Sequence, residues 1–407
     1  MVGSVNAERG ARALEFGIYR DGDNNLDDVQ AQTIAQAVQT SARDHSVEFT
    51  VEDTTARRGF LRAHMLRTES YTIADGDVAS NVRVSPPHDM ADRANLAAFV
   101  ARTLDGAERS HARATWIDLV DHGAGDGGGL EADHGSGVMR ADDIAGAIAD
   151  GVAEHAREHP EDAGRRVDGV LSNQCLMSTE AFSYSLSQAG VRYLAASPET
   201  MLAPGVPTSV ATDVSHHLDD PVAMARAVVR RTMSTRYDAG GLGTFGPAAA
   251  FDVIDLDPKK IGTMTRDVAA LDAEIGRDAR NRTVRAAVRE DARAVPGMTR
   301  FTRQALPWHA DRPAIALYDV LASDGRLPAS LRAAAATASD AVGATVLAHR
   351  ESADFEPFGA GYSDAAGPTV HFPITPRQID TWAPEIRETD NAFYQAVGGE
   401  KLAHVLA

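Results

Sequence analysis

The stretch VDGVLSNQCLM, residues 167–177, constrains the fold more than any other part of the chain. Val167, Val170 and Leu171 are apolar, which is typical of a buried β-strand. The strand ends in polar residues and in Cys175, the only cysteine of the protein. Apolar side chains then recur at helical spacing, so we expect a helix to follow directly. Cys175 should therefore lie at the carboxyl end of a strand, beside a helix N-terminus that would favour a thiolate.

A second strand of the same character lies upstream. Residues 114–120, ATWIDLV, run into Asp121, His122 and Gly123. Most single cysteines are small buried hydrophobes rather than nucleophiles. Here a histidine precedes Cys175 by about 50 residues and also follows a predicted strand, and that arrangement is typical of one class of cysteine nucleophile. We therefore expect His122 and Cys175 to meet at one edge of a sheet.

Two segments between these residues bear on function. Residues 123–137 form a glycine-rich loop with a second Asp-His-Gly motif around His134, which we discount because no strand precedes it. Residues 157–166 are a charged linker. Exposed segments of this kind are where proteolytic cleavage concentrates. We expect the chain to process itself between His122 and Cys175.

Composition excludes some partners. The net charge of the 407 residues is −18, which argues against nucleic acid because phosphate binding needs clustered cations. No apolar run is long enough to span a membrane, and the first residues lack a signal-peptide core. A single cysteine fits a reducing compartment. These observations predict a soluble, cytoplasmic protein.

Strands alternate with helices over residues 1–218, which predicts a mostly parallel sheet with helices on both faces. Residues 219–407 read as mainly helical, with long helical stretches at 258–294 and 328–350. We expect this region to complete the core or to pack on it.

Several motifs occur in the order of a known family. They are Asp21-Gly22-Asp23-Asn24-Asn25-Leu26, Asp121-His122-Gly123, Gln174-Cys175-Leu176-Met177, Ser197-Pro198-Glu199-Thr200 and the late stretch 367–373. On these residues the chain resembles the clostripain family of cysteine peptidases, within the group of caspases, gingipains and legumains. The resemblance implies an α/β fold of caspase type, a three-layer α/β/α sandwich with a mostly parallel central sheet.

The resemblance also implies a cysteine endopeptidase that acts on protein or peptide substrates. Cys175 would be the nucleophile, and His122 the general base and acid. The backbone N–H groups of Gly123 and Cys175 would form the oxyanion hole. The alternative is a catalytically silent protein of the same fold with a binding or regulatory role.

Specificity is the point where the sequence departs from the family. The family's Asp two residues before the cysteine is associated with cleavage after Arg or Lys, and Asn173 stands in that place. A neutral amide weakens the attraction for a bound cation. Glu199 could supply a carboxylate instead, and Arg20 could reverse the preference. We expect all three side chains to line the substrate pocket.

A metal site on the first acidic loop is the remaining hypothesis. Asp21, Asp23, Asp27 and Asp28 lack the spacing of an EF-hand. Turn and helix-capping roles explain them better. We therefore expect no metal and no cofactor, although the family resemblance leaves calcium open.

Overall fold

The computed structural model describes most of the chain. The described residues are 11–58, 64–79, 82–131, 138–238, 244–295, 311–352, 366–375, 391–398 and 406. The second Asp-His-Gly motif, with His134, lies outside these residues.

The core is a mixed β-sheet with the strand order β15-β13-β10-β9-β6-β1-β2-β3-β4. The strands from β10 to β2 in this order run parallel to one another, and β13, β15 and β3 are antiparallel to their neighbours. Every residue of β1, β6 and β9 is buried, because helices cover both faces of the sheet. The strands are β1 Leu14–Asp21, β2 Val47–Arg58, β3 His64–Ala74, β4 Asp77–Val78, β6 Ala114–Val120, β9 Gly169–Asn173, β10 Tyr193–Ala196, β13 Ala250–Asp255 and β15 Val346–Glu351.

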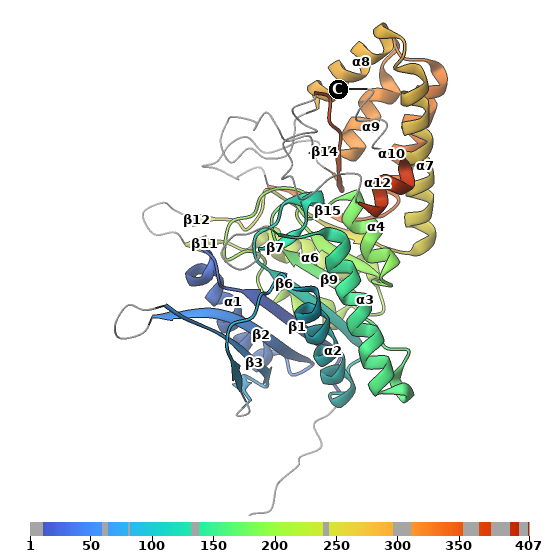
Figure 1. Ribbon diagram of the computed structural model, residues 1–407. Coiled ribbons are helices and arrows are strands. Elements are labelled where there is room, and N and C mark those ends of the chain that lie inside the picture. The colour runs from blue at the N-terminus through green and yellow to red at the C-terminus, as the bar shows by residue number, and fades with distance from the viewer. Residues whose placement is uncertain are drawn as a thin grey trace, which may run out of the picture.

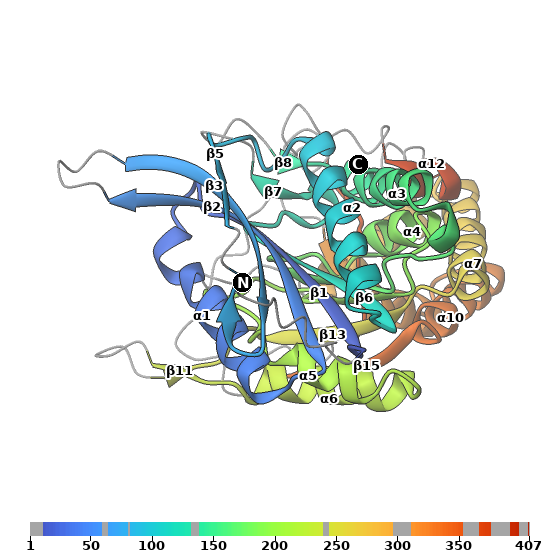
Figure 2. The same ribbon diagram turned by 90° about the horizontal axis from the view of Figure 1, so that it is seen from below.

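Two helical layers flank the sheet (Figure 2). One layer contains α2 Arg93–Arg109, α3 Ala141–Glu158 and α4 Glu180–Gln188. The other contains α1 Asp27–Arg43, α5 Val210–His216 and α6 Pro221–Ser234. Separate hydrophobic clusters fill the two interfaces between sheet and helices. The result is a three-layer sandwich.

Residues beyond 218 contribute both strands and helices. β13 and β15 extend the sheet at one edge. The helices α7 Pro258–Asp278, α8 Arg282–Ala294, α9 Ala314–Ser323, α10 Ala329–Gly343 and α12 Ala392–Val397 gather on the side of α4 (Figure 1). No helix in the described residues is long and apolar enough to cross a bilayer.

The prediction of a helix through residue 350 is wrong at its end. The helix α10 ends at Gly343, and Val346–Glu351 is the strand β15. This segment pairs with β13 in antiparallel fashion, so a long-range strand contact overrides the local helical pattern.

Candidate active site

The register of two neighbouring strands places the backbones of the predicted pair at the same edge of the sheet. In β6 and β9, Val120 lies opposite Asn173. His122 follows Val120 by two residues, and Cys175 follows Asn173 by two residues. Because the strands are parallel, both side chains leave the same edge of the sheet at the same height.

The two loops that follow these strands are in close contact. A Cβ atom on Gly123 would lie 2.2 Å from the carbonyl oxygen of Cys175 and 3.0 Å from its nitrogen. Only glycine allows the two backbones to approach in this way. The side chain of Gln174 joins the same loops, because its Nε2 donates to the carbonyl oxygen of His122 at 2.9 Å.

The imidazole of His122 is held by the first acidic loop. Its Nε2 lies 2.8 Å from Oδ1 of Asn25, and an amide oxygen can only accept, so this nitrogen carries the proton. The next residue back, Asn24, donates to the buried carboxylate of Asp121 at 2.6 Å. Sequence reasoning missed this role of the two asparagines. Their place directly after a parallel strand was the available signal.

The surroundings of Cys175 differ from the sequence prediction. The helix α4 begins at Glu180 with Thr179 as its N-cap, so the thiol does not lie at a helix N-terminus. Leu176 has a φ of 67°, a left-handed conformation that turns the chain away from a helix at this point. The sulfur instead contacts the backbone of Met201, whose N–H donates to Sγ at 3.2 Å.

The surroundings of Cys175 favour the thiol over the thiolate. Burial raises the pKa of Cys175, the N–H of Met201 opposes that shift, and the charges of Glu199 and Asp121 raise the pKa further. The expectation of a thiolate stabilised by a helix is therefore wrong for this resting arrangement. A base has to remove the proton when the sulfur attacks.

Two of the predicted pocket residues, Asn173 and Glu199, contact different segments of the chain. Asn173 is buried, and its Oδ1 accepts from the N–H of Val206 at 2.9 Å. Glu199 is also buried, and its carbonyl oxygen accepts from the N–H of Leu176 at 2.9 Å. Both residues therefore brace loops around Cys175, and Glu199 is close enough for its charge to act on the thiol.

Arg20 lies two strands away from Cys175, at the end of β1. Its Nε donates to Asp53 at 2.7 Å, and its Nη1 donates to Asp27 at 3.0 Å. The guanidinium is 1% exposed and occupied by these two carboxylates. These contacts tie Arg20 to the first loop, and its place in the substrate pocket stays a prediction.

A buried carboxyl group was missed by sequence reasoning. Asp118, in the middle of β6, is fully buried, and burial raises its pKa well above the usual range despite the nearby amide of Asn173. The pattern ATWIDLV does not show whether this aspartate is buried or is a polar residue on an exposed face of the strand. Burial therefore favours the neutral form of this carboxyl group, which lies near the amide of Asn173 at the end of β9.

The acids of the first loop do not assemble a cation site in the described part of the chain. The groups of His, Cys, Asp and Glu that are close enough to share an ion include none of the acids of 21–28. One such group lies at the candidate active site and consists of Asp121, His122 and Glu131. In it, Nε2 of His122 is 3.9 Å from Oε2 of Glu131.

Solved structures share this fold. A secreted C11 cysteine protease from Bacteroides thetaiotaomicron, in complex with an irreversible peptide inhibitor, is 12% identical, with 95% of this chain and 99% of that chain covered and a TM-score of 0.64. An inactive zymogen C11 protease from Parabacteroides distasonis is 16% identical, with 95% and 98% covered and a TM-score of 0.60. No protein-family model and no curated protein matches the chain. The predicted caspase-like α/β fold of clostripain-type (C11) proteases is confirmed.

The charge of Glu199 should be measurable at the thiol. We expect Glu199→Gln to lower the pKa of Cys175, because it removes a negative charge that disfavours the thiolate. The rate of alkylation by iodoacetamide between pH 7 and 10 should then reach its half-maximum at a lower pH than in the wild type. Glu274→Gln, on the distant helix α7, is the control and should leave the profile unchanged. An unchanged profile in Glu199→Gln would show that this carboxylate does not act on the thiol.

Proposed function

We propose that this protein is a cysteine endopeptidase with Cys175 as the nucleophile and His122 as the general base. The observation that carries the proposal is the contact of Gly123 with the backbone of Cys175, at the ends of two parallel strands in register. The C11 protease of Bacteroides thetaiotaomicron was solved with a peptide inhibitor, which supports a peptide substrate here. No role for nucleic acid or membrane is proposed, and a cytoplasmic location remains a prediction.

The first chemical step follows from the proton positions. Because Nε2 of His122 donates to Asn25, Nδ1 carries the lone pair that can accept a proton. As Sγ of Cys175 leaves the backbone of Met201 and attacks the substrate carbonyl carbon, its proton passes to this nitrogen. The C=O electrons move to oxygen, and the resulting oxyanion accepts hydrogen bonds from the N–H groups of Gly123 and Cys175.

The remaining steps return the enzyme to its starting state. The tetrahedral intermediate collapses, the C–N bond breaks, and the amine leaves with the proton from His122. Water then attacks the thioester with His122 again as base, which releases the acid product and restores the thiol. Asn25 acts through His122 and is a positioning residue.

We also propose that the chain is cut between His122 and Cys175. Arg157 is exposed in the last turn of α3, and Arg166 is exposed in the segment that leads from α3 to β9. The comparison with a zymogen supports a latent form.

Substitution of the pair tests the proposal. Cys175→Ala should abolish peptide hydrolysis, and His122→Ala should lower kcat by roughly 10² to 10⁴, the usual contribution of general-base catalysis. His134→Ala is the matched control, because it removes the histidine of the other Asp-His-Gly motif, and it should keep full activity. Intact-mass measurement of the same samples should find cleavage in the wild type but not in Cys175→Ala. Folded wild type without hydrolysis of any peptide in a diverse library would favour the silent binding protein.

The role of Asn25 can be separated from a structural one. Asn25→Ala should lower kcat about tenfold with little change in KM, because the imidazole loses its fixed tautomer. Asn25→Asp keeps an acceptor and adds a negative charge beside the ring, which favours the protonated imidazole. The acidic limb of the pH–rate profile should therefore move to higher pH while activity is largely retained. Equal loss in both variants, with no shift of that limb, would contradict the assignment.

For specificity, we propose that Glu199 and not Asn173 attracts a basic residue before the cleaved bond. The amide of Asn173 is engaged with Val206, whereas the carboxylate of Glu199 acts on the thiol. Glu199→Gln should lower the ratio of kcat/KM for Arg-ending over neutral substrates by about tenfold, equivalent to ~1.4 kcal/mol. A change in thiol reactivity affects both substrates equally, so it cancels in this ratio of kcat/KM values. Glu131→Gln, next to His122, is the control, and an equal fall there would refute a specific role for Glu199.

A further inference from the structure

Two histidines at the end of α3 point their ring nitrogens at one carboxylate oxygen. His155 and His159 are one helical turn apart, and their rings stack with centroids 4.8 Å apart. Oδ1 of Asp105, from α2, lies 2.8 Å from Nδ1 of His155 and 3.4 Å from Nε2 of His159. These three atoms form a convergent set of nitrogen and oxygen ligands.

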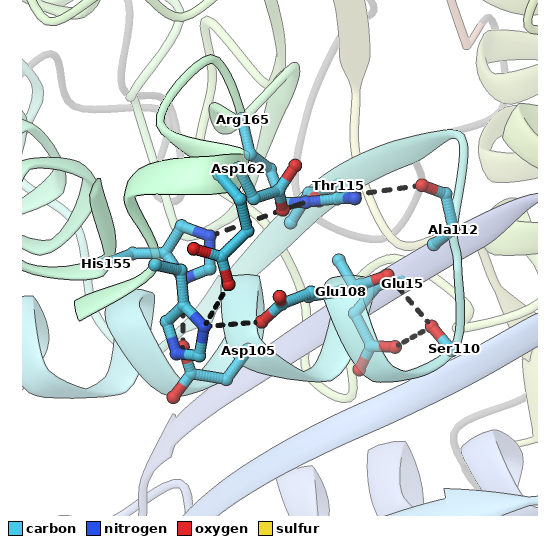
Figure 3. A network of polar contacts seen from close by, with 12 residues as sticks. Glu15, Asp105, Glu108, Ser110, Ala112, Thr115, His155, Asp162 and Arg165 are labelled. Atoms are coloured by element: carbon cyan, nitrogen blue, oxygen red, sulfur yellow. Dashed lines mark hydrogen bonds and ion pairs between the residues drawn. The ribbon is translucent and has the colours of Figure 1, made fainter. Parts of the chain in front are cut away.

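The other nitrogen of each ring also faces a carboxylate. Nε2 of His155 is 3.4 Å from Asp162, and Nδ1 of His159 is 2.7 Å from Glu108. Figure 3 shows how Asp105, Glu108, His155 and Asp162 converge. Carboxylates on the outer nitrogens are the usual partners of histidines that bind a metal through the inner ones.

Two neutral rings cannot donate to a carboxylate from all four nitrogens, so the arrangement needs either added protons or a metal ion. A neutral imidazole has one N–H and one lone pair, so two neutral rings supply two donors for four nitrogens. Two lone pairs would then face carboxylate oxygens. A metal ion between the inner nitrogens and Asp105 removes the conflict, because each outer nitrogen then donates to its own carboxylate.

The charges around the two histidines also favour a bound cation. The carboxylates Asp105, Glu108 and Asp162 surround the two rings. Arg165 is ion-paired with Asp162, and Arg102 is close enough to Asp105 for their charges to interact, which still leaves an excess of one negative charge among these groups. A divalent ion would offset the excess of negative charge. His155 has a fully buried side chain, whereas the side chain of Asp105 is 26% exposed and that of His159 is 30% exposed, so an ion could enter from solvent.

We propose that His155, His159 and Asp105 form a binding site for a divalent transition-metal ion of the zinc class, with Asp162 and Glu108 as outer partners. Imidazole ligands select zinc-like ions over calcium or magnesium. For bonds of about 2.0–2.1 Å, ligand atoms in a tetrahedron lie about 3.4 Å apart. The 3.4 Å separation of His159 and Asp105 already fits, and the 2.8 Å separation of His155 and Asp105 has to widen by a few tenths of an ångström. Three protein ligands leave the fourth position to water.

The site would act as a clamp on the segment before β9. Asp162 belongs to the short 3₁₀ turn Pro160–Asp162, and Arg165 donates to the carbonyl oxygen of Ala112, just before β6. The ion would tie this segment to the ends of α2 and α3. Cys175 lies at the opposite end of β9, so the site is separate from the candidate active site.

Zinc binding to the protein tests the proposal. We would use Cys175→Ala, so that the thiol is not a ligand, strip it with a chelator, and measure Zn²⁺ by equilibrium dialysis and elemental analysis. It should bind one zinc per chain, and saturating zinc should raise Tm by about 4 °C. His159→Gln in this background should weaken binding at least tenfold and remove the Tm shift. Asp105→Asn provides a second, independent ligand change with the same expected loss.

His216→Gln, which removes a surface histidine paired with a single carboxylate, is the matched control and should bind zinc like its parent. Unchanged binding in His159→Gln together with loss in His122→Ala would assign the ion to the candidate active site and overturn the proposal. Absence of zinc uptake in the parent at micromolar concentration would overturn it as well.

Discussion

The backbone contact between Gly123 and Cys175 is the constraint on which the site depends. It requires two parallel strands in a fixed register, because a slip of one residue would turn every side chain to the opposite face. The helical layers that bury both faces of the sheet hold that register. The packed layers therefore keep residues 122 and 175 at the same edge of the sheet.

Electrostatics around the thiol decide how the pair can work. A thiol whose pKa is raised by burial and by nearby carboxylates is not a preformed nucleophile. In the proposed mechanism, Nε2 of His122 donates to Asn25 and the other ring nitrogen acts as the base. In such a mechanism a base activates the nucleophile and a third group orients the base. Here we propose that the third group is Asn25, from a loop far away in sequence.

Sequence patterns were sufficient where the determinants are local. Two buried strands, each ending in a candidate reactive residue, predicted the fold class and the placement of residues 122 and 175 at neighbouring strand ends. They were insufficient where distant partners decide. The helix expected directly after Cys175 starts later, and Arg20 is held by carboxylates from two other segments. The four-residue spacing of His155 and His159 was visible, but the carboxylates opposite them come from α2 and the linker.

The central claim is that Cys175 attacks peptide carbonyl groups with the help of His122. Its most direct test uses a peptide with an electrophilic ketone in place of the cleaved bond, followed by peptide mapping of the adduct. The account predicts a stoichiometric adduct on Cys175, slowed by competing peptide and slowed at least a hundredfold in His122→Ala. An adduct that forms equally fast in His122→Ala, or modification at random sites without protection by peptide, would contradict it.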